Sequence, residues 1–290
     1  MSETKRILIF SDNPGDDYVS RIHSGVSKVG SAERFEIKSV NIYRHRRSIT
    51  EVMEETGCNG LIVTPPVSDD RHSILQIETR GIPYVRIAPL LDLDKGNRVT
   101  MDEFDAAAAI TGLLVNNGHR RIGIMRGPNT HLVSMRRYNG YTHALGAKGL
   151  RVDNSLVVQG DFTRQSGREQ ARKLFAAKPT AIFASNDEMA AGIIDAANEA
   201  GISIPGTISL VGYDDVAVAN TTRPRLTTVR QPLEEMGEAA CRLLVDQIRN
   251  PSRPCQHTLV PFEIVERESV AEYVAEPDET PRLRSNSISI

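Results

Sequence analysis

The residues best suited to chemistry are Asp and Asn side chains that closely follow short apolar segments. They are Asp12, Asn186, Asp187, Asp214 and Asp215. In an open sheet of parallel strands, ligands bind in the crevice outside the carboxyl ends of the strands. Carboxylates there accept hydrogen bonds from hydroxyl groups, and amides both donate and accept. The positions indicate a site for a polyhydroxyl ligand such as a sugar; alternatively, Asp187 and Asp215 only cap the helices that follow them.

A sugar site also needs a hydrogen-bond donor with fixed geometry and a flat apolar surface for the C–H face of the ring. Arginine donates two hydrogen bonds from one plane, and Tyr or Phe supplies the flat surface. The candidate partners are Arg137, Gln231, Phe162 and Tyr18. Residue type alone does not distinguish Arg137 from the neighbouring Arg136. We expect the arginine that binds the ligand to be solvated in the cleft, where it contributes little to stability.

Motifs of catalysis and of metal binding are missing from the sequence. There is no G-x-G-x-x-G after an expected strand, no G-x-x-x-x-G-K-[ST], no H-E-x-x-H and no G-x-S-x-G. The seven histidines do not have the spacing of metal ligands. Three widely spaced cysteines, Cys58, Cys241 and Cys255, are typical of reduced thiols. We therefore predict no catalytic residue, no metal and no cofactor.

Short apolar segments alternate with longer segments of helical period along the chain. The expected strands cover residues 6–10, 60–64, 83–88, 121–125, 180–185 and 209–213. The expected helices cover residues 16–29, 104–115, 135–148, 164–177, 187–200 and 233–248. This alternation predicts parallel sheets with helices on both faces. A chain of 290 residues is long enough for two such lobes.

The predicted fold class is α/β, with two doubly wound parallel-sheet lobes joined by about three crossovers. The crossovers are expected near residues 117–120, 230–233 and 250–254. They divide the chain into an N-terminal lobe of residues 1–117 and 233–250 and a C-terminal lobe of residues 118–232 and 254–268. Residues 269–290 are acidic and then rich in Pro, Arg, Ser and Asn, so a flexible tail is expected there.

The charge balance and the hydropathy restrict the partners. Lys and Arg total 35 and Asp and Glu total 37, a net charge of −2, so the chain is not expected to bind DNA by itself. No apolar segment is long enough for a membrane helix or has the form of a signal peptide. We therefore expect a cytoplasmic protein without a membrane partner.

Two long segments resemble the core of the lactose-repressor (LacI/GalR) family of bacterial transcription regulators. Residues 105–149 contain V-N-N-G-H-R-R-I-G-I and R-R-Y-N-G-Y, and residues 179–231 contain F-A-S-N-D, V-G-Y-D-D and L-T-T-V-R-Q. The resemblance extends from about residue 5 to about residue 268. It implies a type I periplasmic-binding-protein-like fold with a small-molecule effector, expected to be a sugar, bound between the lobes of a repressor.

The resemblance also implies roles for individual residues. Those matched to effector-binding positions are Arg137, Asn186, Asp214, Asp105, Phe162 and Gln231, with Asp12 and Tyr18 in the loop after the first strand. That loop, residues 11–18, is more acidic than is usual in the family. Its acids either favour a polyhydroxyl ligand or form a solvated helix start.

Family resemblance further implies a homodimer that binds operator DNA through an N-terminal head. Here the first expected strand begins within ten residues of Met1, and we expect that a head was removed rather than naturally absent. The alternative function is a sugar-binding receptor for a membrane transporter, which shares the fold but would need a signal sequence. An α/β enzyme has only the fold in its favour.

Overall fold

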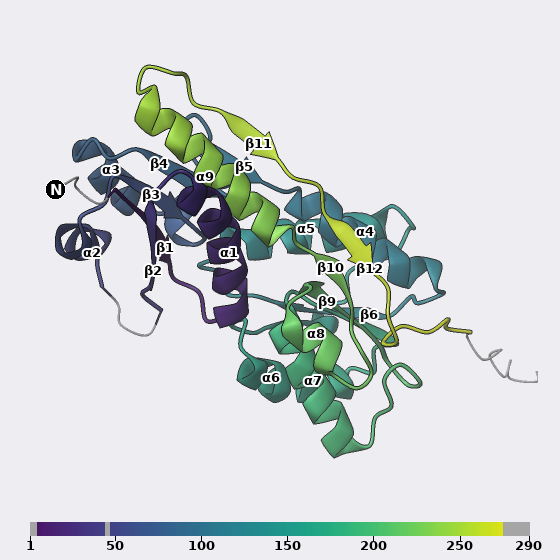
Figure 1. Ribbon diagram of the computed structural model, residues 1–290. Coiled ribbons are helices and arrows are strands. Elements are labelled where there is room, and N and C mark those ends of the chain that lie inside the picture. Colours follow the sequence, from purple (N-terminus) through teal and green to yellow (C-terminus); the bar gives the residue numbers. More distant parts are fainter. Residues whose placement is uncertain (1–4, 44–46, 275–290) are drawn as a thin grey trace, which may run out of the picture.

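Two six-stranded sheets organise the computed structural model, which describes residues 5–43 and 47–274 (Figure 1). The first sheet contains β1 (Arg6–Ser11), β2 (Glu36–Asn41), β3 (Gly60–Val63), β4 (Tyr84–Ile87), β5 (Asn97–Thr100) and β11 (His257–Leu259). The second contains β6 (Ile122–Arg126), β7 (Val157–Gln159), β8 (Ala181–Ala184), β9 (Ser209–Asp214), β10 (Thr227–Arg230) and β12 (Glu263–Val265). Their strand orders are β11-β5-β4-β3-β1-β2 and β12-β10-β9-β8-β6-β7. Every paired strand is parallel to its neighbour except β12, which runs antiparallel to β10.

Helices cover both faces of each sheet, which confirms the predicted doubly wound α/β class. The first lobe has α1 (Asp16–Ala32), α2 (Ile49–Thr56), α3 (Arg71–Thr79) and α9 (Leu233–Arg249), with a short 3-10 helix, η1 (Val67–Asp69). The second lobe has α4 (Glu103–Asn116), α5 (Leu132–Gly146), α6 (Arg164–Ala176), α7 (Asp187–Ala200), α8 (Ala217–Thr221) and η2 (Asn154–Leu156). In Figure 1, α1 and α9 lie side by side on one face of the first sheet.

The alternation of side chains along β1 shows why helices are needed on both faces. Ile7 and Ile9 pack into the core beneath α1 and α9, whereas Leu8 and Phe10 pack beneath α2 and α3. Successive side chains of a strand point to opposite faces, so an uninterrupted apolar strand must be covered twice. The helices cover the faces of the sheets and not the carboxyl ends of the strands. Polar residues collect at these ends.

The chain crosses between the lobes at residues 101–102, 231–232 and 260–262, between β5 and α4, β10 and α9, and β11 and β12. The predicted crossover at 230–233 contains one of these segments. The predictions at 117–120 and 250–254 are wrong, because those turns join α4 to β6 within the second lobe and α9 to β11 within the first.

The first misplacement has a physical cause in the packing of α4. Its buried side chains Ile110 and Leu114 belong to the core of the second lobe, and Phe104 and Ala107 lie directly against Gly140 of α5. The glycine turn after residue 117 ends a helix, and a helix end carries no information about which sheet that helix covers. Residues 103–117 therefore belong to the second lobe, and the predicted N-terminal lobe was too long.

The predicted flexible tail begins too early. Ser269 is fully buried, its hydroxyl donates to the Leu210 carbonyl (2.6 Å), and the Tyr273 N–H donates to the Asn117 carbonyl (2.7 Å). The Tyr273 ring also stacks on His119 at 5.4 Å between centroids. Residues 269–274 thus pack on the second lobe, and residues 275–290 lie outside the described part. No helix in the described ranges is both long and apolar enough to cross a membrane.

Candidate functional site

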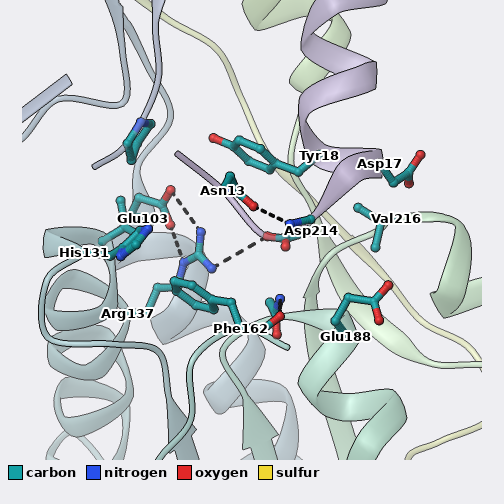
Figure 2. A pocket seen from close by; sticks show the side chains of 14 residues that line it. Asn13, Asp17, Tyr18, Glu103, His131, Arg137, Phe162, Glu188, Asp214 and Val216 are labelled. Carbon is teal, nitrogen blue, oxygen red and sulfur yellow. Dashed lines mark hydrogen bonds and ion pairs between the residues drawn. The ribbon is translucent and has the colours of Figure 1, made fainter. Parts of the chain in front are cut away.

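A narrow cavity of about 50 Å³ lies between the lobes, at the carboxyl ends of their strands. The first lobe contributes side chains that follow β1 and β3, chiefly Asn13, Asp17, Tyr18 and Pro65. The second lobe contributes Glu103, His131, Arg137, Phe162, Asn186, Glu188 and Asp214. Figure 2 shows the two sets facing one another, with Tyr18 and Asn13 on one side and Arg137 and Phe162 on the other. Among residues 5–43 and 47–274, no group of three or more His, Cys, Asp or Glu side chains could hold a metal ion.

Arg137 is the centre of the polar network in the second lobe. Its Nε donates to Glu103 Oε2 (2.8 Å) and its Nη1 donates to the Ser185 carbonyl (2.6 Å). The same Nη1 lies 3.7 Å from Asp214 Oδ1, as the dashed lines of Figure 2 indicate. The guanidinium carbon lies 3.8 Å from the centre of the Tyr213 ring, a cation–π contact. The Arg137 side chain is only 5% exposed, so the expectation of a solvated arginine is wrong.

Glu103 occupies the position that the sequence assigned to Asp105. Asp102 caps α4 by accepting from the N–H groups of Phe104 (3.0 Å) and Asp105 (2.9 Å), and Glu103 is the first helical residue. Asp105, two residues further on, is rotated by about 200° around the helix and points to solvent. The expectation that Asp105 lines the site is wrong, because Asp105 is exposed on the other side of α4, whereas Glu103 lines the cavity.

Burial and the surrounding charges perturb the titration of this network. Burial alone would lower the pKa of Arg137, but Glu103, Tyr213 and Asp214 together raise it, so the guanidinium stays charged. Burial raises the pKa of the Asp214 carboxyl to about 7, although Arg137 and the Gln231 amide oppose the shift. Burial, reinforced by Asp214, also raises the pKa of Asp187. Part of the cost of burying Asp214 is therefore relieved by protonation near neutral pH.

Gln231 acts on the cavity through Asp214 rather than by lining it. Its Nε2 donates to Asp214 Oδ1 (2.6 Å), and it lies in the segment where the chain crosses from β10 to α9. Asp214 and Asp215 both have positive φ angles, 111° and 55°, which are strained for residues other than glycine. The cavity is thus bordered by a strained turn next to a crossover.

Several bonds hold that turn in place. Asp187 accepts from the Val216 N–H (2.9 Å) and from the Thr228 hydroxyl (2.6 Å). Arg230 and Arg267 bind the Asp215 carboxylate at 2.7 and 2.6 Å. Asp187 therefore stabilises the turn, and Asp215 is paired with two cations. Neither residue lines the cavity.

Asn186 both caps a helix and lines the cavity. Its Oδ1 accepts from the Met189 N–H (3.0 Å) and caps α7, while its Nδ2 donates to the Phe162 carbonyl (2.9 Å) at the cavity wall. His131 meets the Phe162 ring edge-on at 5.4 Å. Burial, and secondarily Arg137, lower the pKa of His131 to about 4, so this ring is neutral at physiological pH.

The first lobe closes the cavity through the start of α1. The Ala217 N–H donates to Asp17 Oδ2 (2.8 Å), and Arg21 Nη1 donates to the Asp215 carbonyl (2.9 Å). Tyr18 is buried against the cavity, and this burial raises the pKa of its hydroxyl. Asp12 does not line this cavity; it borders an adjoining groove with Arg47 and Thr130.

Five of the eight predicted residues meet at the cavity: Arg137, Asp214, Asn186, Phe162 and Tyr18. Gln231 contacts one of them, and Asp105 and Asp12 lie elsewhere. Five further residues line the cavity and were not predicted from the sequence: Glu103, Asn13, Asp17, His131 and Glu188. A signal for Glu103 is the Asp that precedes it. Asp is a common helix-capping residue, and Asp102 marks Glu103 as the first residue of α4.

Comparisons with known proteins agree with this architecture. Residues 111–270 match the family described as "Periplasmic binding protein-like domain". The chain is 30% identical over 282 residues to the HTH-type transcriptional repressor PurR of Klebsiella pneumoniae (strain 342), covering 94% of this chain and 82% of that protein. A solved complex of the transcriptional regulator CelR with cellobiose superposes with a TM-score of 0.82 at 26% identity, covering 93% of this chain and 86% of that one. A putative LacI-family regulator from Sanguibacter keddieii DSM 10542 gives a TM-score of 0.79 at 29% identity, over 91% and 97% of the two chains.

Arg137→Ala should lower the free energy of unfolding by about 3–5 kcal/mol, because it leaves Glu103 buried without its cation. Arg136→Ala is the matched control, since Arg136 is exposed one residue earlier on the same helix, and it should change stability by less than about 1 kcal/mol. Urea denaturation of both variants measures the difference. Equal unfolding free energies for the two variants would show that Arg137 does not form a buried ion pair with Glu103.

Asp214→Asn should flatten the pH dependence of stability. The native pKa of about 7 lies above the ordinary value of 3.8, so the native state holds a proton that the unfolded state lacks between those values. Stability contributed by this group is therefore complete below about pH 3.8 and is lost as pH rises through 7. Unfolding free energies at pH 5 and pH 8 should differ less in the variant than in the unmodified chain, and an unchanged difference would contradict this assignment.

Proposed function

Because the chain belongs to the LacI/GalR family of bacterial transcriptional regulators, we propose that its inter-lobe cavity binds a small carbohydrate that controls the regulator. The observation that carries the proposal is the Arg137–Glu103–Asp214 network beside two aromatic rings. Three of the five N–H groups of Arg137 are bonded within the protein, which leaves two for ligand hydroxyls. Phe162 and Tyr18 offer apolar surface for the C–H face of a sugar ring.

The bound cellobiose of the CelR regulator supports the carbohydrate class, because that protein shares the whole fold with this chain. In the proposal, Asp214 accepts a hydrogen bond from one sugar hydroxyl while Arg137 donates to the next. Asn186 orients the wall that carries Phe162. The site binds its ligand without chemical change, and the chain acts as a regulator and not as an enzyme.

Effector control is proposed to act through the turn that contains Asp214 and Asp215. Arg230 bridges Asp215 (2.7 Å) and Glu263 (2.8 Å), and so joins this turn to β10, which precedes one crossover, and to β12, which follows another. Arg21 and Asp17 join the same region to the first lobe. A ligand that prefers one arrangement of the lobes shifts the equilibrium only by its difference in affinity for the two arrangements.

The proposal includes a homodimer that binds operator DNA in the cytoplasm through a separate N-terminal DNA-binding head. An exposed apolar surface on the first lobe supports self-association: Leu75 of α3 is 57% exposed, and Leu91 and Leu93 are 38% and 46% exposed. The Arg71–Asp92 ion pair (2.9 Å) joins α3 to the segment that carries Leu91 and Leu93, so these side chains belong to one region. A dimer with two-fold symmetry can bind both half-sites of an operator that has the same symmetry.

A thermal-shift panel of mono- and disaccharides, followed by titration calorimetry on the sugars that stabilise the chain, tests the proposed ligand. At least one saccharide should raise the melting temperature, since it binds only the native state. Arg137→Lys, which keeps the charge but loses the planar pair of donors, should bind that saccharide at least tenfold more weakly, whereas Arg136→Lys should bind it normally. A panel without any stabilising saccharide would refute the carbohydrate proposal.

Sedimentation velocity tests the proposed dimer. The unmodified chain should sediment as a dimer at micromolar concentration, and Leu75→Glu with Leu93→Glu should sediment as a monomer, because charges would be buried at the interface. Met135→Glu serves as the control, since Met135 is 51% exposed on α5 of the other lobe. A monomeric unmodified chain would count against the dimer.

A further inference from the structure

We infer that the effector carries no negative charge, so that the cavity admits neutral or cationic ligands and discriminates against phosphorylated and carboxylated ones. This inference rests on the proposed function and narrows its ligand class. Its basis is the charge of the described side chains that line the cavity and the way in which the helices begin there.

Carboxyl groups outnumber cations around the cavity. Among residues 5–43 and 47–274, the carboxyl groups that line it are those of Asp17, Glu103, Glu188 and Asp214, against one guanidinium, that of Arg137. Glu103 already neutralises that guanidinium in a buried ion pair. The low pKa of His131, caused first by burial, leaves its ring without charge at neutral pH. An anionic ligand would therefore meet an excess of negative charge from Asp17 and Glu188 even where Asp214 is protonated, and little solvent screens that charge.

Two of these carboxylates belong to opposite lobes and border the same side of the cavity. Asp17 lies in the first turn of α1 and Glu188 in the first turn of α7, and both appear at the same edge of Figure 2, near Val216. Burial raises the pKa of Glu188, and the charge of Asp17 raises it further. Arg164 opposes this shift but is itself paired with Asp195 through two bonds of 2.7 and 2.8 Å. A phosphate at this edge would have to approach both carboxylates.

Helix N-termini are the usual place where backbone N–H groups bind phosphate. Here the first turns of α1, α4 and α7 already contain acidic residues of the chain: Asp16, Asp17, Glu103, Asp105, Asp187 and Glu188. These carboxylates satisfy the helix dipoles that a ligand anion would otherwise use. The first turn of α5 has no acidic residue. If an anionic ligand did bind, the N–H groups of this turn are where we would expect its charged group.

Calorimetry of the full chain with matched ligands tests the inference. The first set of probes is glucose, glucosamine, glucose 6-phosphate and glucuronate. The second set is cellobiose and cellobionate, and the third is ribose and ribose 5-phosphate. All are measured at the same pH and ionic strength. In each set that binds, the anionic member should bind at least tenfold more weakly than its neutral partner. An anionic member that binds as tightly as, or more tightly than, the neutral one overturns the inference.

The same experiment separates this inference from the proposed function. If no saccharide binds, the carbohydrate class fails, and adenosine with adenosine 5′-monophosphate then decides the question of charge. Binding of adenosine alone supports the inference, whereas tighter binding of the nucleotide, or binding of neither, overturns it.

A double variant tests which residues discriminate. Asp17→Asn with Glu188→Gln should reduce the ratio of neutral to anionic affinity by at least tenfold. Glu169→Gln with Glu235→Gln removes the same charge from exposed positions and should leave the ratio unchanged. If the two double variants give the same ratio, Asp17 and Glu188 do not set the charge preference.

Discussion

The structure of the cavity depends on one buried guanidinium. Arg137 connects α5 to the first residue of α4 through Glu103, to the end of β8 through the Ser185 carbonyl, and to the end of β9 through Asp214. A buried charge without partners would cost several kcal/mol, so these elements must keep their relative positions. The second lobe therefore presents a preformed polar wall, and the first lobe completes the cavity by bringing Tyr18, Asn13 and Asp17 against it.

The same constraint links the site to the rest of the molecule. Asp214, which lies beside Arg137, has a positive φ, and the strained turn that contains it is held by Asp187, Arg230 and Arg267. Arg230 also binds Glu263 on β12, the strand that follows the third crossover. The cavity is therefore joined by covalent and ionic links to segments that connect the two lobes.

Much of the fold could be predicted because local periodicity determines it: apolar strands such as β1 and β9 must be covered on both faces, and polar residues then collect at strand ends. Asn186 and Asp214 were predicted from such positions together with the family resemblance, whereas Arg137 was predicted from the resemblance alone. Asp105 was misassigned because the family resemblance does not show which acidic residue at the start of α4 faces the cavity, and Glu103 and Asp105 lie about 200° apart around the helix. The crossovers were misplaced because α4 chooses its sheet through long-range packing on Gly140, which leaves no local signal. The burial of Ser269 depends likewise on a distant partner, the Leu210 carbonyl.

A crystal structure of the chain with a saccharide that stabilises it would test the central claim most directly. We expect the sugar between the lobes, with adjacent hydroxyls bonded to Arg137 and Asp214 and its ring against Phe162 or Tyr18. A sugar bound outside this cavity, for example in the groove beside Asp12, with the Arg137 network undisturbed and unliganded, would contradict it.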